Sequence, residues 1–252
     1  MRTALITGAT AGIGRAFAHE LAARGMNLVL VARDEPRLLA LAGELNFDFG
    51  VEVQVMSADL SNQTQIDEVA CRAAAEDIDL VVNNAGFGLN QPFVGGDVKA
   101  EQQMLDVLVT AVLRITHAAL PGMVERNRGG VINVSSVASW LASGTYSAAK
   151  SWVTTFSESL ATQLRGTDVH VMALCPGFTR TEFHDRANME TATIPEWMWL
   201  EVDEVVKEAL TDFAGQHAVS VPGVQYKSLG LVAQYLPRPL VRKISVMQAR
   251  RR

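Results

Sequence analysis

The chain is expected to fold as an α/β protein with a doubly wound parallel sheet in a single domain. Short apolar runs rich in β-branched residues recur along the 252 residues, and amphipathic stretches separate them. Most of the runs are apolar throughout, as strands covered on both faces are. Such regular alternation predicts βαβ units with right-handed crossovers. No repeat, low-complexity stretch or linker divides residues 1–252, so one domain is predicted.

Seven strands are predicted, and each ends where a candidate functional loop begins. They are Thr3–Thr7, Asn27–Ala32, Val51–Met56, Asp79–Asn83, Gly130–Ser135, Val169–Leu174 and a short edge strand, Ala218–Val221. The helix after the first strand is expected to end at Gly25, because glycine is common just past a helix C-terminus. Ligands of open parallel sheets bind outside the carboxyl ends of the strands. The residues that follow each strand are therefore the functional candidates.

Composition and charge narrow the class of protein. The chain is 48% hydrophobic and 19% charged, as globular proteins are. Its net charge of −5 argues against a nucleic-acid partner. Cys71 and Cys175 give neither metal-ligand spacing nor a disulfide framework. The N-terminus reaches glycine too early for a signal peptide, and no apolar run is expected to approach a membrane span. These observations predict a cytoplasmic protein with no metal site and no integral membrane segment.

The last residues reverse the overall charge. Residues 236–252 carry six basic side chains and no acid. Either a solvated basic tail or an amphipathic contact with an anionic surface fits this pattern, and the solvated tail is favoured.

A glycine-rich loop, TGATAGIG, follows the first predicted strand. Gly8, Gly12 and Gly14 are spaced differently from the G-x-G-x-x-G fingerprint, but the same physics applies. Glycine permits a tight turn, lets the backbone approach a pyrophosphate, and opens onto a helix N-terminus whose N–H groups favour an anion. A dinucleotide-binding loop is predicted; a glycine-rich turn without a ligand is the alternative.

The end of the second strand favours NADPH over NADH. Ala32 stands where an acid usually binds the ribose diol of NAD, and Arg33, suited to a 2′-phosphate, follows it. Arg15 is a candidate second cation. Asp34 leaves an alternative open, because it could pair with Arg33 or accept the ribose itself. A surface ion pair is a further alternative for Arg33.

The third predicted strand is followed by SADLS. Asp59 and Leu60 stand where an adenine could be held. An Asp before a helix is also a common cap, so the signal is weak by itself.

A tyrosine and a lysine lie four residues apart in GTYSAAKSW. Tyr146 and Lys150 would share one face of a helix. An adjacent cation favours phenolate and lowers the pKa of a tyrosine. The pair is therefore a candidate for proton transfer, against the alternative of two polar residues on one helix face.

Five motifs occur in order: TGATAGIG, NNAG (Asn83–Gly86), NVSS (Asn133–Ser136), YSAAK (Tyr146–Lys150) and PGFTRT (Pro176–Thr181). With them the chain resembles the short-chain dehydrogenase/reductase family from Thr3 to about Gly223. The resemblance implies a Rossmann-type domain, a nicotinamide coenzyme, and hydride transfer between a carbonyl and an alcohol.

The resemblance also implies roles for individual residues. Tyr146 would be the general acid/base, and Lys150 would lower its pKa and hold the nicotinamide ribose. Ser136 would bind the substrate oxygen, with Ser135 as a possible substitute; Asn83 would steady the fold and the cofactor loop, and Thr181 would meet the carboxamide. The implied cofactor-binding set is Gly8, Thr10, Gly12, Ile13, Gly14, Arg33, Asp59, Leu60, Asn83, Ala85, Gly86, Tyr146, Lys150, Pro176, Gly177, Phe178 and Thr181.

The chain departs from the family pattern in two places. The segment between Ser136 and Tyr146 is shorter than is common in the family. Leu108 stands where family members generally carry an asparagine that holds a proton-relay water, and leucine cannot form hydrogen bonds. Either the relay reaches Lys150 another way, or turnover is slow, or the change is a tolerated core substitution.

The substrate side is expected to be apolar. By resemblance, residues 183–200 cover the substrate as a lid. The candidate lining residues are Phe87, Trp140, Phe183 and Trp197, although a lid tryptophan could instead contact only core. Family members often pair through the helix that carries Trp152 and Phe156, so a homodimer or homotetramer is implied. A face buried within one chain would explain these aromatics equally well.

The predicted function is that of an NADPH-dependent carbonyl reductase, or of an alcohol dehydrogenase in the reverse direction. A moderately large apolar substrate is expected, such as a 3-oxoacyl, steroid-like or xenobiotic ketone. The alternative is a dinucleotide-binding sensor or scaffold protein of low turnover, motivated by Leu108. Nucleotide-sugar chemistry is disfavoured, because the chain after Gly177 leaves little room for a sugar-nucleotide subdomain.

Overall fold

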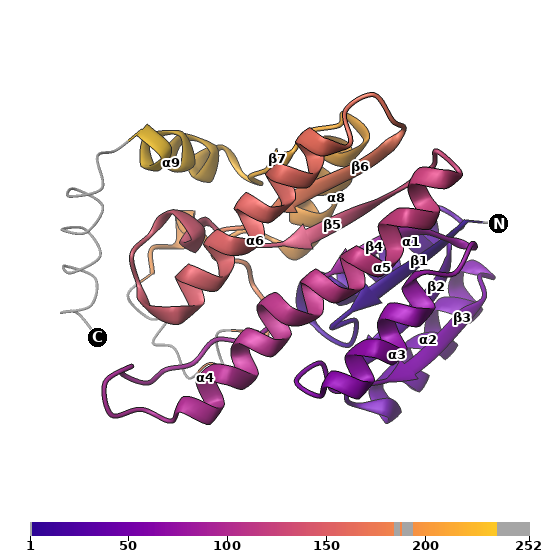
Figure 1. Cartoon of the computed structure of the whole chain (residues 1–252), viewed down its shortest axis with the longest axis horizontal. Helices are drawn as coiled ribbons and strands as arrows, with labels where there is room; N and C mark the ends of the chain where they lie inside the picture. The colour runs from indigo at the N-terminus through magenta and orange to yellow at the C-terminus, as the bar shows by residue number, and fades with distance from the viewer. Residues whose placement is uncertain (1, 184–186, 188–193, 236–252) are drawn as a thin grey trace.

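The computed structural model describes residues 2–183, 187 and 194–235 and contains one seven-stranded parallel sheet (Figure 1). The strand order is β3-β2-β1-β4-β5-β6-β7. Strand order therefore reverses between β1 and β4, which is where open α/β sheets bind their ligands. The strands are β1 (Thr3–Thr7), β2 (Asn27–Ala32), β3 (Val53–Ser57), β4 (Ile78–Asn83), β5 (Gly129–Val134), β6 (Val169–Leu174) and β7 (Val219–Ser220).

Helices cover both faces of the sheet, as the apolar strands require. In Figure 1, α3, α5 and α6 lie in front of the sheet and α1, α2 and α8 behind it. The helices are α1 (Gly12–Ala23), α2 (Glu35–Phe49), α3 (Gln63–Ala73), α4 (Val98–Leu105), α5 (Ala111–Glu125), α6 (Gly144–Gln163), α8 (Val202–Ala214) and α9 (Val224–Tyr235). Within the described part of the chain there are also three short helical segments: the π-helical η1 (Asp106–Thr110) and the 3₁₀ turns η2 (Val137–Trp140) and η3 (Glu196–Met198).

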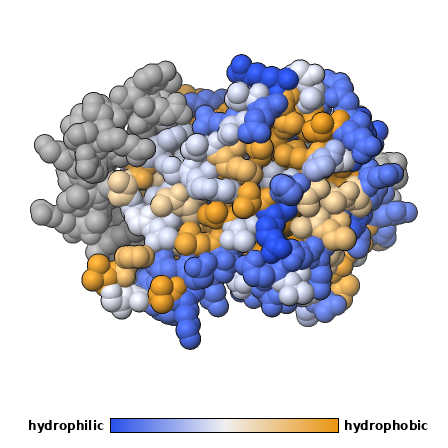
Figure 2. Space-filling model, in the orientation of Figure 1, coloured by the Kyte–Doolittle hydropathy of each residue, from blue (hydrophilic) through white to orange (hydrophobic). Residues whose placement is uncertain are grey.

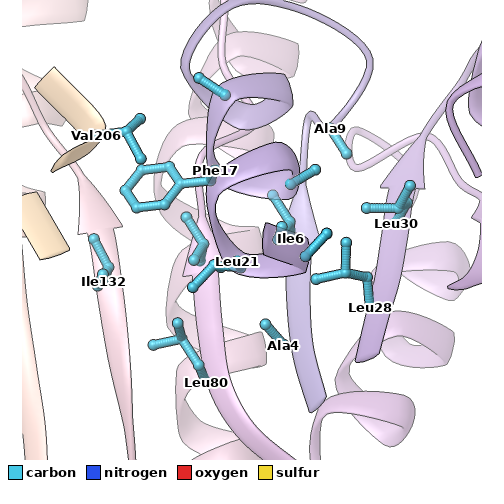
Figure 3. Close-up of a cluster of buried hydrophobic side chains, with 14 of the residues drawn as sticks. Ala4, Ile6, Ala9, Phe17, Leu21, Leu28, Leu30, Leu80, Ile132 and Val206 are labelled. Atoms are coloured by element: carbon cyan, nitrogen blue, oxygen red, sulfur yellow. The ribbon is translucent and has the colours of Figure 1, made fainter. Parts of the chain in front are cut away.

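Each central strand sends alternate residues into two separate cores. In β1, Ala4 and Ile6 join the core under α1, α2 and α8, whereas Leu5 joins the core under α3 and α5. Figure 3 shows the first core, where Phe17 of α1 lies close to Val206 of α8. The predicted doubly wound α/β fold is confirmed, and the two cores fix the carboxyl edge of the sheet from both sides.

One continuous helical stretch, Val98–Glu125, is long and apolar enough to cross a membrane by length and composition alone. It comprises α4, η1 and α5. The expectation that no apolar run approaches a membrane span is therefore wrong for this stretch. Its buried residues include Leu108, Ile115 and Met123, which pack inside the protein, as the core helix of a globular domain also would. Figure 2 shows apolar residues among polar ones in the middle of the face where α5 lies.

Candidate active site

The glycine loop after β1 has a backbone that only glycine fits well. Gly8 and Gly12 have φ angles of +67° and +52°. A Cβ on Gly14 would lie 2.3 Å from the carbonyl oxygen of Gly8. The loop is held from outside by Asn84, whose Nδ2 donates to the carbonyl oxygens of Thr7 at 2.9 Å and Gly8 at 3.1 Å. Main-chain atoms therefore define this part of the site.

The N-terminus of α1 offers an uncompensated positive end to a ligand. Its N-cap residue, Ala11, makes no side-chain hydrogen bond to the first turn, and that turn contains no acid. The first N–H groups of a helix have no partner within the helix, and the helix dipole favours an anion there. Together with the close approach that the glycines allow, this arrangement fits the pyrophosphate of a dinucleotide.

The structure excludes two alternatives at the end of β2: a pairing of Asp34 with Arg33, and another ion pair of Arg33 among the described residues. Asp34 caps α2, because its Oδ1 accepts a hydrogen bond from the backbone N–H of Arg37 at 3.0 Å. Within the described residues the exposed Arg33 side chain forms no hydrogen bond or ion pair, so Asp34 does not engage it. Arg15 is not a free second cation, because it pairs with Glu44 at 3.0 Å.

The candidate adenine residues follow β3. The Asp59 carboxylate accepts from the N–H and the hydroxyl of Ser61, each at 2.9 Å. It is not the cap of α3, since Asn62 has that position. Leu60 is buried against the core, so only its backbone is available to a ligand. Contact of either residue with adenine stays a prediction.

The candidate catalytic residues converge at the ends of β5 and α6. Ser136 follows β5, and Tyr146 and Lys150 occupy the first two turns of α6. The Nζ of Lys150, a residue only 5% exposed, donates to the carbonyl oxygen of Val134 at 2.6 Å and lies 5.8 Å from the centroid of the Tyr146 ring. The structure thus brings together the three residues that the motifs indicate.

Burial shifts the pKa values of both titratable groups toward their neutral forms. Burial raises the pKa of Tyr146 to about 12, and hydrogen bonding with the Ser136 side chain opposes this shift. Burial lowers the pKa of Lys150 to about 8. The expectation that Lys150 lowers the pKa of Tyr146 is therefore not met, because desolvation of the phenol dominates the shift and the opposing hydrogen bond comes from Ser136. At neutral pH Tyr146 is a phenol that can donate a proton.

The two serines after β5 have different surroundings. Ser135 is buried, and its hydroxyl donates to the carbonyl oxygen of Lys150 at 2.8 Å and lies 2.7 Å from the hydroxyl of Thr154. Ser136 is less buried and interacts with Tyr146. Of the two candidates, Ser136 is the one that bonds to Tyr146, and Ser135 secures the backbone at Lys150; contact of Ser136 with a substrate stays a prediction.

The Asn83 side chain lies in a buried network, as expected of a residue that steadies the fold, and its contact with a cofactor stays a prediction. Its side chain is buried and donates to Thr116 Oγ1 at 3.0 Å and to Asn133 Oδ1 at 2.8 Å. Asn133 continues this network to Ser157 Oγ at 3.0 Å. Asn83 therefore joins β4, β5, α5 and α6, and the neighbouring Asn84 is the residue that supports the glycine loop. The NNAG motif contains both asparagines. The motif therefore indicates the right place in the chain but does not show which of the two supports the glycine loop.

Leu108 lies beside the lysine inside the π-helical turn η1. It is 1% exposed and packs with Phe87 and Tyr146. A Cβ built on Gly86 would lie 2.8 Å from Leu108 Cδ2 and 3.8 Å from the Nζ of Lys150. An apolar side chain thus occupies the neighbourhood where the family pattern places a hydrogen-bonding one.

The segment after β6 is held by a residue that the sequence analysis missed. The hydroxyl of the buried Tyr226 donates to the carbonyl oxygen of Met198 at 2.7 Å and accepts from the N–H of Phe178 at 3.0 Å. The Tyr226 ring fills the space beside Gly177, where a Cβ would lie 2.1 Å from it. No motif marks Tyr226, since its partners are distant in sequence. It positions the PGFTRT motif at the carboxyl edge.

The four predicted substrate residues separate into two groups. Phe87 packs in the same cluster as Tyr146, and the ring of Phe183 lies 5.9 Å from the Tyr146 ring. Trp140 instead contacts α9 at Gly230, and Trp197 is 63% exposed. The structure brings Phe87 and Phe183 to Tyr146, and contact of the two tryptophans with a substrate stays a prediction. Residues 184–186 and 188–193 of the predicted lid, and the basic tail, lie outside the described residues.

The comparisons with known proteins agree with this geometry. Residues 2–192 match the short chain dehydrogenase family. Over 186 residues the chain is 40% identical to the NADP-dependent 3-hydroxy acid dehydrogenase YdfG of Salmonella typhi, covering 71% of this chain and 73% of that protein. It is 34% identical over 187 residues to the very-long-chain 3-oxoacyl-CoA reductase of Anas platyrhynchos, covering 71% of this chain and 60% of the length of that relative.

A solved structure matches nearly the whole chain. The short-chain dehydrogenase from Sphingobium yanoikuyae in complex with NADPH is 34% identical, with a TM-score of 0.86 and coverage of 93% of this chain and 94% of that one. A Rossmann-like sheet with a glycine loop at its switch point defines a dinucleotide-binding protein. The chain belongs to the short-chain dehydrogenase/reductase family of NAD(P)-dependent oxidoreductases.

Proposed function

We propose that the protein is an NADPH-dependent carbonyl reductase, or an alcohol dehydrogenase in the reverse direction, acting on a moderately large apolar substrate. The observation that carries this proposal is the convergence of Ser136, Tyr146 and Lys150 next to the glycine loop. A carbonyl oxygen placed between the Ser136 hydroxyl and the Tyr146 phenol would meet two donors at once. Both would stabilise the negative charge that develops on that oxygen.

The residues of the chain supply binding and proton transfer. A bound nicotinamide would supply or accept the hydride. Ser136 would donate a hydrogen bond to the carbonyl oxygen, and Tyr146, a phenol at neutral pH, would transfer its proton to the same atom. Lys150 would place a positive charge near the phenolate left behind, because its Nζ is 5.8 Å from the ring centroid. In the reverse direction the phenolate would accept the proton of an alcohol.

Three observations support NADPH as the coenzyme. The Arg33 side chain is exposed and forms no hydrogen bond or ion pair among the described residues. No acid stands at Ala32, where one would bind the ribose diol of NAD. A 40% identical relative is named as NADP-dependent, and the matching solved structure holds NADPH.

The apolar substrate class is supported by the surroundings of Tyr146. Phe87 and Phe183 contribute aromatic surface beside the candidate proton donor. One similar protein is named as a very-long-chain 3-oxoacyl-CoA reductase. Ketones with an apolar chain or ring system, including 3-oxoacyl and steroid-like compounds, are therefore the first class to screen.

The test is a coenzyme titration followed by a carbonyl screen. Purified protein is titrated with NADPH and with NADH, and oxidation of NADPH is then followed by absorbance with ketones of increasing size. Tighter binding of NADPH and turnover that increases with apolar size are expected. Absence of NADPH binding, or turnover only with small polar carbonyls, would contradict the proposal.

A second candidate function is dinucleotide sensing with little turnover. It rests on Leu108, whose side chain is buried beside Lys150 where proton exchange would need a polar group. If this position limits turnover, Leu108→Asn raises kcat without changing NADPH affinity, and the volume-conserving Leu108→Met does not. An unchanged kcat in Leu108→Asn would show that proton exchange takes another route.

Assembly as a homodimer or homotetramer and a cytoplasmic location stay predictions. Trp152 and Phe156 stack on α6 with ring centroids 4.6 Å apart, and both side chains are only partly buried. This ridge is compatible with pairing of two copies, which sedimentation would measure.

A further inference from the structure

An arginine that the sequence motifs do not single out reaches across the glycine loop. Arg37 lies in the first turn of α2, directly after the end of β2. Its Nη2 donates to the carbonyl oxygen of Thr10 at 3.2 Å and to Glu182 Oε1 at 2.9 Å, and its Nη1 lies 3.4 Å from Glu182 Oε2. We call this Arg37–Glu182 ion pair the clasp. It joins two segments 145 residues apart.

The clasp fixes the middle of a three-residue strap, Thr181–Phe183. Thr181 lies on the glycine loop, because its Cβ and Cγ2 are each 3.0 Å from the position of a Cβ on Gly12. Phe183 lies against Tyr146, with ring centroids 5.9 Å apart. Consecutive residues of the strap therefore contact the phosphate loop, the end of β2 through Arg37, and the candidate proton donor.

Arg37 lies on the side of the site where the 2′-phosphate, the group that distinguishes NADPH from NADH, is expected to bind. In sheets of this kind the ribose that carries the 2′-phosphate of NADP lies at the end of β2, where an arginine accommodates it. Arg33 stands at that end, and its side chain has no partner among the described residues. Arg37 brings a second guanidinium to the same side of the glycine loop, but there a carboxylate compensates its charge.

The Arg37–Glu182 ion pair is weak enough for another anion to replace the Glu182 carboxylate. Its two side chains are 43% and 49% exposed, so water screens their attraction, and exposed ion pairs of this kind are weak. A phosphate group carries up to two negative charges and three acceptor oxygens, which a guanidinium can bind in a bidentate manner. A phosphate at this place would compete well with a single exposed carboxylate.

We propose that Arg37 is a coenzyme-specificity residue, and that the 2′-phosphate of NADPH displaces Glu182 from it. The proposal rests on the NADPH preference proposed above. Glu182 then weakens NADPH binding and leaves NADH binding unaffected, because only NADPH carries the competing group. Release of Glu182 on binding also frees the strap between the glycine loop and Tyr146.

The test uses two coenzyme fragments that differ only in the 2′-phosphate. Adenosine 2′,5′-bisphosphate and adenosine 5′-monophosphate are titrated by calorimetry against the wild-type protein and its variants. Glu182→Gln is expected to tighten binding of the bisphosphate about two- to fivefold, the size of a weak exposed ion pair, and to leave the monophosphate unchanged. Arg37→Gln is expected to weaken the bisphosphate alone, and to abolish the gain from Glu182→Gln in the double variant.

Two variants serve as controls. Glu20→Gln breaks a surface pair, with Arg24 at 2.8 Å, at the end of α1 away from the glycine loop, and is expected to change neither affinity. Arg37→Lys keeps the charge but loses the bidentate geometry, so an intermediate affinity for the bisphosphate is expected. Thermal unfolding of every variant, compared with wild type, shows which variants fold.

The outcomes separate this inference from the proposed function. The inference is overturned if Glu182→Gln changes both fragments equally, leaves the bisphosphate unchanged or weakens it. Wild-type protein that binds both fragments equally tightly would overturn the NADPH preference itself. A clear wild-type preference for the bisphosphate that persists in Arg37→Gln would keep that preference and overturn the role of Arg37.

Discussion

The nucleotide half and the catalytic half of the sheet's carboxyl edge are held in different ways. At the ends of β1 and β4, glycines and main-chain carbonyls form the surface, and Asn84 fixes them by two hydrogen bonds to backbone oxygens. At the ends of β5 and β6, side chains form the surface, and burial is the main cause of the pKa shifts of Tyr146 and Lys150. The nucleotide half presents a surface of fixed main-chain shape. The catalytic half presents side chains with particular functional groups.

This difference predicts different consequences of mutation. A change in the nucleotide half has to move backbone, so it should affect stability and coenzyme affinity together. A change in the catalytic half can remove one functional group in place, so it should affect the rate and leave the coenzyme site intact. The variants below test that division, beginning with the largest expected effect.

Tyr146→Phe should lower kcat by about 10²–10⁴-fold, the usual contribution of an acid/base group. NADPH affinity should stay close to that of wild type, because the change removes one hydroxyl, whose partner is the Ser136 side chain, and leaves the ring in place. Steady-state kinetics and a coenzyme titration measure the two quantities. A loss of less than about tenfold in kcat would contradict the role assigned to Tyr146.

Gly14→Ala should act on the nucleotide half. The added Cβ would lie 2.3 Å from the carbonyl oxygen of Gly8 and 2.4 Å from Asn84 Nδ2, so the loop must move. We expect the free energy of unfolding to fall by about 1–3 kcal/mol, together with weaker NADPH binding. Chemical denaturation and a coenzyme titration measure both.

Gly43→Ala is the matched control for that change. A Cβ on Gly43 would have nothing within 4 Å, and the residue lies inside α2. It should raise the free energy of unfolding by up to about 1 kcal/mol, since alanine favours a helix over glycine. Equal destabilisation by both variants would contradict the account of the loop.

Lys150→Met should change how stability depends on pH. Burial lowers the pKa of Lys150 from 10.5 to about 8, so between those values the unfolded chain binds more protons than the folded one. The contribution of Lys150 to the free energy of unfolding therefore rises with pH across that window, by about 1–3 kcal/mol, and Lys150→Met should lack this rise.

Denaturant unfolding of the coenzyme-free protein at pH 8 to 10 measures the effect. The raised pKa of Tyr146, about 12, contributes stability that is lost only above its ordinary value of 10. Lys99→Met, at an exposed lysine, is the control and should retain the wild-type pH dependence. An unchanged slope in Lys150→Met would contradict the effect assigned to burial.

Much of the fold could be predicted because it depends on local patterns. The predicted strand Val169–Leu174 has the bounds of β6, since an apolar run between turns leaves little choice. The predicted Val51–Met56 begins two residues before β3, because Gly50 ends α2 in the left-handed region and the chain needs Val51 and Glu52 to complete the turn. The glycine loop could be predicted from the sequence equally well, because its backbone conformation requires glycine at particular positions.

The features that the sequence does not reveal are distant contacts and the direction of side chains. Asn83 is the last residue of β4, and one step along a strand reverses the face to which a side chain points, so Asn83 enters the buried network while Asn84 meets the loop. The pKa of Tyr146 depends on burial, which spacing to Lys150 does not reveal. The clasp joins residues 145 apart in sequence, and no local pattern indicates such a contact.

The bridge made by Tyr226 has a consequence for how the protein is made. Its hydroxyl connects the N–H of Phe178 to the carbonyl of Met198, and its ring fills the space beside Gly177. Domains can begin to fold during synthesis, from the N-terminus onward. The glycine loop and its supporting strands leave the ribosome early, whereas the catalytic edge lacks this support until α9 has been synthesised. A chain shortened before Val224 should therefore keep most of the sheet and lose the anchoring of Phe178 and Met198.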